Sequence, residues 1–201
     1  MNRWIRSEVS AILLAAGRSR RMEGGADKLL LPFRGKTLFM LALELLDSMP
    51  FYEKIVVTTD ERLKKAELQA GIIPIINPHP ENGQGESVSL GTKAAGGSRY
   101  LFLGADQPLL NRDTLRWLLL NSRENAGKIV CPSVEGKPSN PVIFPARFRD
   151  ELLALLGDAG GRAVRKAHPE DCLLLPAKDS RIFRDIDRME DYLGLIAGGE
   201  A

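Results

Sequence analysis

Cysteine and histidine are scarce in this sequence, with two residues of each among 201. Cys131 and Cys172 lack the CxxC spacing of a metal site or redox motif, so we interpret both as small core residues. His79 and His168 stand alone in the sequence, and solvated or helix-capping roles are expected for them. The sequence has no nucleophile elbow and no Ser-His-Asp order, so covalent acyl chemistry is not indicated.

Long apolar runs and an excess of charge of one sign are also lacking. The formal net charge is +2, with 27% charged residues, so a general nucleic-acid or membrane surface is not indicated. No apolar run is long enough to span a bilayer. Glu8 and Ser10 interrupt the apolar segment that a signal peptide would need. We therefore expect a cytoplasmic protein without nucleic-acid or membrane partners.

What the sequence does have is a regular alternation of apolar runs and amphipathic segments. The length of 201 residues, with no linker-like stretch, predicts one domain over residues 1–201. Strands are expected at residues 9–14, 55–59, 72–76, 100–104, 129–132, 141–144 and 173–176. Helices are expected at residues 37–49, 61–70, 86–95, 113–121, 146–156, 161–167 and 189–196. This order predicts a single-domain α/β fold with a Rossmann-like, doubly wound, mostly parallel sheet.

The most informative stretch is residues 9–31. The first expected strand runs into the small residues 15–17, and a basic loop follows that ends at Asp27 and Lys28. Small residues let backbone N–H groups approach an anion, and nearby cations add charge, so this loop predicts a polyphosphate site. The pattern is neither a Walker A loop nor a GxGxxG motif. A plain turn with solvated arginines is the alternative.

Two acidic positions predict a metal site. Asp106 directly follows the apolar strand expected at residues 100–104, which places it at the carboxyl edge of the sheet. A carboxylate at this edge can hold Mg²⁺ together with substrate phosphates, whereas the alternative is a helix cap. Asp185 and Asp187 alternate on an extended segment and point the same way. We expect Asp187 to be the second ligand, and again a capping pair is the alternative.

Further polar residues fall at the same edge of the predicted sheet. Thr58 lies near the end of the second expected strand, and Gly85 and Ser87 introduce the helix at 86–95, where Ser87 offers a hydroxyl to a base edge or an N-cap. The expected nucleotide-binding residues are Leu14, Ala15, Ala16, Gly17, Arg18, Arg21, Lys28, Thr58, Gly85, Ser87 and Asp106.

These parts together suggest nucleotidyl transfer. A nucleoside triphosphate would lie with its phosphates against the basic loop, Lys28 and Mg²⁺, and a phosphate oxygen of a second substrate would attack the α-phosphorus, releasing pyrophosphate. Positioning and charge neutralisation supply most of the rate in such reactions. The expected catalytic residues are Arg21, Lys28 and Asp106.

The sequence resembles molybdenum cofactor cytidylyltransferases, within the MobA-like nucleotidyltransferase family, over nearly its whole length. The matching stretches are 13–17, 21–22, 27–32, 35–36, 85–91, 104–108, 140–144, 157–163 and 185–187. The resemblance implies CTP and molybdenum-bound molybdopterin as substrates, Mg²⁺ as cofactor, and a molybdenum hydroxylase as recipient of the product. It also implies that residues 15–17, Arg21 and Lys28 line the nucleotide and that Asp106 binds the metal.

Two local differences from the family pattern concern the choice of substrate. Guanylyl-transferring relatives tend to have a second glycine where this chain has Ala16, and the extra methyl group leaves less room for a purine. Ser139, Asn140 and Pro141, the expected pterin-contacting loop, replace a Gly-His-Pro sequence of the family. Two alternatives therefore stay open: nucleotidyl transfer to a sugar phosphate or other small phosphate, and a non-catalytic chaperone that carries the molybdenum cofactor.

Overall fold

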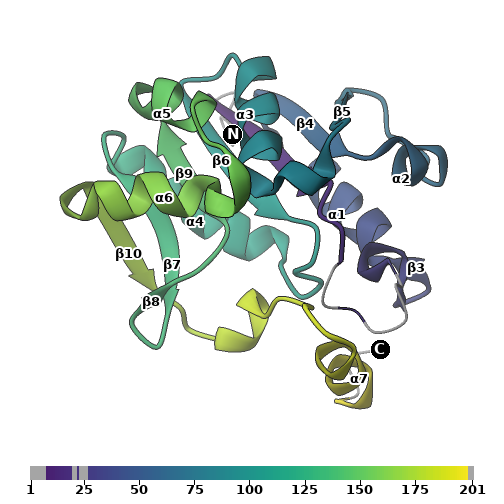
Figure 1. Ribbon diagram of the computed structural model, residues 1–201. Coiled ribbons are helices and arrows are strands. Elements are labelled where there is room, and N and C mark those ends of the chain that lie inside the picture. Colours follow the sequence, from purple (N-terminus) through teal and green to yellow (C-terminus); the bar gives the residue numbers. More distant parts are fainter. Residues whose placement is uncertain (1–7, 20–21, 23–26, 199–201) are drawn as a thin grey trace, which may run out of the picture.

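The computed structural model describes residues 8–19, 22 and 27–198. Its centre is an eight-stranded sheet in the order β10–β7–β9–β6–β1–β4–β5, with β8 paired to β7 (Figure 1). The strands of this sheet are β1 (Val9–Ala15), β4 (Glu53–Thr58), β5 (Ile72–Ile76), β6 (Arg99–Gly104), β7 (Ile129–Val134), β8 (Lys137–Pro138), β9 (Val142–Pro145) and β10 (Cys172–Pro176). A small antiparallel ribbon is formed by β2 (Pro32–Phe33) and β3 (Lys36–Thr37).

The sheet is mostly parallel, as the sequence predicts. Strand β1 pairs in parallel with β4 and β6, β4 with β5, and β7 with β10. The exception is β9, which runs antiparallel to both β6 and β7 and so joins the two parallel parts of the sheet. Strand β5 lies at one edge, where Pro74, which has no backbone N–H to donate, is tolerated. The predicted fold class is therefore confirmed.

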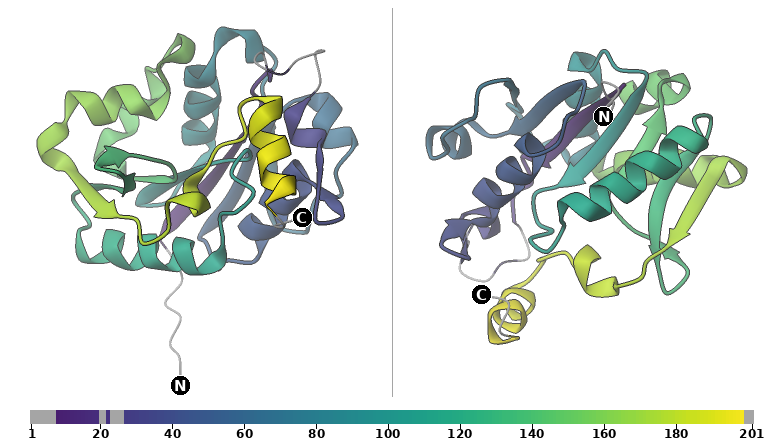
Figure 2. Two further views of the ribbon diagram at one scale, coloured as in Figure 1. Left: turned by 90° about the horizontal axis from the view of Figure 1, so that it is seen from below. Right: turned by 180° about the vertical axis from the view of Figure 1, so that it is seen from behind.

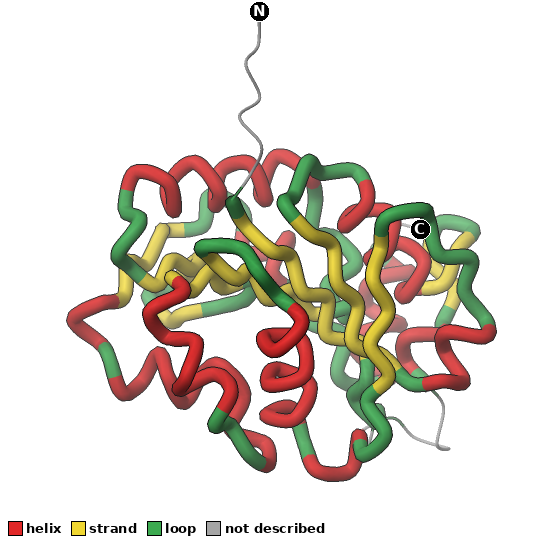
Figure 3. The backbone as a smooth tube through the Cα atoms, turned by 90° about the horizontal axis from the view of Figure 1, so that it is seen from above, coloured by secondary structure: helices red, strands yellow, loops and turns green. Residues whose placement is uncertain are grey.

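Helices cover both faces of the sheet, which gives three layers (Figure 3). Figure 1 shows α3, α5 and α6 on one face, and the view from behind in Figure 2 shows α1 and α4 on the other. The helices are α1 (Leu38–Asp47), α2 (Asp60–Lys64), α3 (Gln84–Ala94), α4 (Arg112–Glu124), α5 (Arg149–Leu153), α6 (Gly160–Ala167) and α7 (Met189–Ala197). None of the helices in the described part of the chain has the length and apolar character required to cross a membrane.

The alternating side chains of the central strand divide the core into two parts. Ala11 and Leu13 of β1 pack into the cluster that contains the apolar residues of α1 and α4, such as Leu43 and Leu118. Ile12, between them in the sequence, packs into the cluster on the opposite face. This two-residue period explains why an uninterrupted apolar run forms a strand buried on both faces.

Two predicted helices are shorter than expected. The helix expected at 61–70 spans only Asp60–Lys64. The apolar residues of the segment, Leu63, Ala66 and Leu68, are only half-buried, so tertiary packing does little to stabilise a longer helix. The helix expected at 146–156 begins as a 3₁₀ turn and ends with α5 at Leu153, so that Leu156 is exposed in the following loop.

Candidate active site

A cavity of about 1220 Å³ opens at the carboxyl ends of β1 and β6 and extends under α6 to β10. Pockets that bind one drug-sized ligand have volumes of roughly 300–1,000 Å³, so this cavity has room for more than one substrate. The predicted site residues that line it are Leu14, Ala16, Gly17, Arg18, Lys28, Ser87, Asp106, Ser139, Asn140 and Asp187. Arg21, a predicted catalytic residue, lies outside the residues that the structure describes.

Four other predicted residues are not among those that line the cavity: Ala15, Thr58, Gly85 and Pro141. Thr58 is completely buried, and its hydroxyl donates to the Ala15 carbonyl over 3.3 Å, so it links β4 to β1 instead of facing the cavity. Gly85 packs against the backbone of Leu156 and Gly157, at distances that leave no room for a side chain. Both residues are thus used in packing in this structure, and contact of either with a nucleotide stays a prediction.

Gly17 differs from Gly85 in its surroundings. A methyl group at Gly17 would meet no described atom within 4 Å. Packing therefore does not explain a glycine here, and the backbone after β1 is open to the cavity that Gly17 lines.

A buried arginine holds the ends of the basic loop together. Arg62 of α2 is 5% exposed, and its guanidinium donates to both carboxylate oxygens of Asp27 over 2.6 and 2.8 Å. It also donates to the carbonyls of Ala15 and Gly17. Asp27 in turn accepts from the backbone N–H of Leu29 over 3.1 Å. Arg62 therefore joins the end of β1 to the segment that carries Lys28, a role that its position in a charged helix did not reveal.

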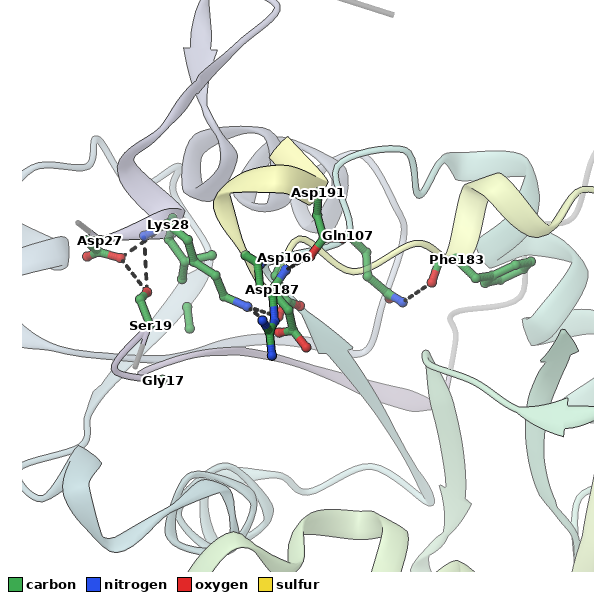
Figure 4. Close-up of polar contacts among 12 residues, drawn as sticks. Gly17, Ser19, Asp27, Lys28, Asp106, Gln107, Phe183, Asp187 and Asp191 are labelled. Carbon is green, nitrogen blue, oxygen red and sulfur yellow. Dashed lines mark hydrogen bonds and ion pairs between the residues drawn. The ribbon is translucent and has the colours of Figure 1, made fainter. Parts of the chain in front are cut away.

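The centre of the site is an ion-pair cluster around Lys28 (Figure 4). The Lys28 ammonium lies 2.6 Å from an oxygen of Asp106 and 3.2 Å from an oxygen of Asp187. The Lys28 side chain is only 12% exposed, whereas those of Asp106 and Asp187 are 27% and 43% exposed. Three predicted site residues that are far apart in the sequence are thus brought together at one point of the cavity.

Backbone contacts explain how the C-terminal segment reaches this cluster. The Ile186 N–H donates to the Asp106 carbonyl over 2.9 Å, and the Ile186 side chain is fully buried beside Phe33 and Leu38. The Asp191 carboxylate accepts from the backbone N–H groups of Asp187 and Arg188, at the start of α7. In Figure 4 the Gln107 amide points away from the cluster toward Phe183, whose carbonyl it contacts over 3.2 Å. These bonds hold residues 185–187 against the turn that follows β6.

The charges of the cluster change the proton affinities of its members. Burial lowers the pKa of Lys28, but the attraction of Asp106 and Asp187 outweighs it, so the net pKa is raised and the side chain stays an ammonium. Asp185 lines the cavity beside them. Desolvation, together with the like charges of Asp106 and Asp187, raises the pKa of Asp185 to about 7.

Three carboxyl groups line the part of the cavity around Lys28. Three carboxyl groups, Asp106, Asp185 and Asp187, influence one another across the cavity, and Lys28 is the cation that pairs with two of them. Burial is the main cause of the raised pKa of Asp185, and the negative charges of Asp106 and Asp187 add to it. Oxygen ligands on a partly exposed cavity wall are the donors that Mg²⁺ and Mn²⁺ bind.

Ser87 lies at the wall of the cavity, but its hydroxyl is already engaged. The buried amide of Asn77 donates to the Ser87 oxygen over 3.0 Å, and the Asn77 backbone N–H donates to the Thr58 carbonyl over 2.9 Å. Asn77 thus fixes the start of α3 relative to β4. In the sequence, this role of Asn77 is indicated only by its position directly after the strand at residues 72–76.

Residues 11–172 match the family described as "MobA-like NTP transferase domain". The chain belongs to this family. The curated protein "Nicotine blue oxidoreductase" from Paenarthrobacter nicotinovorans is 27% identical to this MobA-like chain over 198 residues, which cover 94% of this chain and 96% of that protein.

Solved structures share the fold. A mycobacterial homologue of Rv0371c, from Mycobacterium sp. strain JC1, superposes with a TM-score of 0.81 and 22% identity, covering 96% of this chain and 98% of that one. Rv0371c of Mycobacterium tuberculosis H37Rv, in a complex with manganese, has a TM-score of 0.73 and 20% identity, with 94% and 98% covered. Molybdopterin-guanine dinucleotide biosynthesis protein A of Archaeoglobus fulgidus has a TM-score of 0.67 and 19% identity, with 94% and 99% covered.

Proposed function

We propose that this MobA-like protein transfers CMP from CTP to the phosphate of the molybdenum cofactor, releasing pyrophosphate and forming the cytosine dinucleotide. The observation that carries the proposal is the cluster of Lys28, Asp106 and Asp187 in one cavity with the open backbone of Gly17. Nucleotidyl transfer needs positive charge and a carboxylate-held cation beside a polyphosphate more than it needs a covalent nucleophile.

The proposed roles follow from where the residues lie. Backbone N–H groups at Gly17 and Arg18 would bind the phosphate tail, and the Lys28 ammonium would leave its carboxylate partners in part to neutralise the α-phosphate. Arg62 would keep this loop in place through Asp27. Ala16, which lines the cavity, supports a pyrimidine over the larger purine.

Asp106 and Asp187 are the residues that would hold Mg²⁺. When bound, this ion would supply charge neutralisation for the departing pyrophosphate. We propose Asp106 and Asp187 as the ligands because both carboxylates contact the Lys28 ammonium, so that a single cation already lies within reach of the two side chains. The manganese complex of the Rv0371c structure supports a divalent metal on this fold.

A pyrophosphate-release assay with each of the four nucleoside triphosphates tests the function. We expect release only when CTP, Mg²⁺ and molybdenum cofactor are all present, and its loss in Asp106→Asn. Release with a sugar phosphate as acceptor would support the alternative substrate class. Redox turnover of nicotine blue, without pyrophosphate release from any nucleotide, would contradict the proposal and favour the activity in the name of the relative from Paenarthrobacter nicotinovorans.

A further inference from the structure

The two carboxylates that hold the Lys28 ammonium are kept in place by contacts that do not involve Lys28. The Oδ1 atom of Asp106 lies 2.5 Å from the position that a Cβ of Gly104 would take, so the missing side chain of this glycine makes room for the carboxylate. The backbone N–H of Asp187 donates to the Asp191 carboxylate over 3.1 Å. The surrounding chain therefore sets the positions of both carboxylates, and an ammonium is not needed to bring them together.

The Lys28 ammonium contacts both of these carboxylates at once. Its Nζ atom lies 2.6 Å from Asp106 Oδ2 and 3.2 Å from Asp187 Oδ1, as the dashed lines in Figure 4 show. Both carboxylates are partly exposed on the cavity wall, where a dissolved cation can reach them. A divalent cation bound by these two oxygens would compete with the ammonium for them, and the two positive charges would repel each other.

The side chain of Lys28 is the part of this cluster that is free to turn. The Lys28 backbone N–H donates to the Ser19 hydroxyl over 3.1 Å, and the Lys28 carbonyl accepts from the Leu31 N–H over 3.2 Å. The flexible four-carbon stem beyond this fixed backbone carries the charge. Gly17 and Ser19 line the same cavity as Lys28. Rotation about the bonds of the stem therefore moves the ammonium from the carboxylates toward an anion at these residues, without moving the chain.

We propose that the Lys28 ammonium competes with the divalent cation for Asp106 and Asp187, so that the cation binds strongly only when an anion has drawn the ammonium away. The inference rests on the proposed function in so far as this anion is the phosphate tail of the nucleotide. An ion that binds only the form with Lys28 turned away has its affinity lowered by the small population of that form. Because coupling between two sites is reciprocal, the cation in turn strengthens binding of the anion.

Binding of Mn²⁺ without nucleotide, followed by the electron paramagnetic resonance of the free ion, tests the competition without catalysis. Lys28→Met keeps a side chain of similar length without the charge, and we expect it to bind Mn²⁺ about tenfold more tightly than the wild type, a typical size for coupling between sites. The matched control Lys36→Met removes the same charge from an exposed lysine that pairs with Glu44 and does not line the cavity, and its affinity should equal that of the wild type. The double variant Lys28→Met/Asp187→Asn should lose the gain, because one of the two contested carboxylates is removed.

A second measurement uses the wild type alone and so does not depend on the folding of a variant. Acetylation of lysines by an N-hydroxysuccinimide ester, followed by mass spectrometry, reports how accessible each amine is. Lys28 should react slowly in the free protein, because it is nearly buried and held by two carboxylates. We expect saturating Mg²⁺ to make Lys28 react several times faster and to leave the rate at Lys36 unchanged.

Mn²⁺ binding to Lys28→Met that is no tighter than to the wild type would overturn the competition. An equal gain in Lys36→Met would also overturn it, since the effect would then be one of net charge, as would a gain that persists in the double variant or a labelling rate at Lys28 that Mg²⁺ does not change. If CTP gives no pyrophosphate with any acceptor while Lys28→Met still gains affinity for Mn²⁺, the proposed function fails and the competition stands. Pyrophosphate release from CTP by the wild type, with no gain in Lys28→Met, would leave the function and remove the competition.

Discussion

At the scale of single residues, the proposed function depends on an ammonium placed between carboxylates. Lys28 is nearly buried and held by Asp106 and Asp187, yet it lines an open cavity. A structural ion pair of this kind contributes modestly to stability, because desolvation offsets much of the attraction. A lysine that neutralises phosphate contributes far more to the rate than to the fold.

Lys28→Ala is therefore expected to lower kcat by about 10²- to 10³-fold, the magnitude typical of losing one transition-state stabilising group. The unfolding free energy should fall by about 1–3 kcal/mol, because the carboxylates left without their partner are still partly exposed to solvent. Pyrophosphate release and urea unfolding measure the two effects. Lys36→Ala, an exposed lysine paired with Glu44 and absent from the cavity wall, is the control and should keep full activity. Full activity in Lys28→Ala would contradict the assignment.

The buried thiol of Cys131 gives a prediction on pH. Burial is the main cause that raises the pKa of Cys131 from 9.0 to about 11, whereas an unfolded chain has an ordinary thiol. Because the folded pKa is the higher one, this contribution to stability is present below pH 9 and is lost as the pH rises to about 11. Urea unfolding at pH 8 and pH 10.5 should show a smaller drop in Cys131→Ala than in the wild type. Equal drops would contradict the assignment.

The same residue scale shows what sequence reasoning can reach. Asp106 was predictable because it follows an apolar strand closely, and Lys28 because it ends the loop that leaves another such strand. Parallel strands bring their carboxyl ends to one edge. The inward direction of the Thr58 side chain, toward the Ala15 carbonyl, could not be read from its place at the end of a strand. Arg62 was missed because charged residues in short helices are usually solvated, and only its tertiary contacts distinguish it.

At the scale of elements, α2 acts on the active-site loop through one arginine. Arg62 connects α2 to the carbonyls after β1 and to Asp27 before Lys28. A bidentate arginine–carboxylate pair is directional, and a lysine cannot reproduce it. The two residues should therefore act as one unit.

A double-mutant cycle of Asp27→Ala and Arg62→Ala should reveal this unit. We expect a coupling energy of about 1–3 kcal/mol in urea unfolding, as for groups of one hydrogen-bond network. The KM for CTP should rise in both single variants. Arg62→Lys should have a KM close to that of Arg62→Ala, because a lysine cannot form the bidentate pair. Additive losses of unfolding free energy would show that the two residues do not act together.

The contact of α3 with β1 gives a second prediction at this scale. A Cβ at Gly91 would overlap the Ile12 side chain and lie 3.2 Å from a Val57 methyl group. In Gly91→Ala, the better helix propensity of alanine should raise the unfolding free energy by about 1 kcal/mol, and overpacking should lower it by about 1–3 kcal/mol. A net loss of stability is therefore expected. Gly194→Ala in α7 is the control, because its Cβ would meet nothing within 4 Å, and it should be neutral or stabilising. Equal stabilisation of both variants in urea unfolding would contradict this packing.

At the scale of the whole molecule, the fold brings two halves of the chain to one cavity. Gly17, Arg18 and Lys28 come from the first 28 residues, whereas the cavity-lining residues of α6, Asp185 and Asp187 come from the last third of the chain. Strand alternation predicted the sheet well, because a two-residue period and apolar runs fix local structure. The antiparallel insertion of β9, and with it the position of α6, depends on long-range pairing that no local pattern records.

A crystal structure of the protein with CTP and Mg²⁺ tests the central claim most directly. We expect the triphosphate between the backbone at Gly17 and the Lys28 ammonium, with a metal ion on Asp106 and Asp187. A nucleotide bound elsewhere on the molecule, with Lys28 still closed between Asp106 and Asp187, would contradict it.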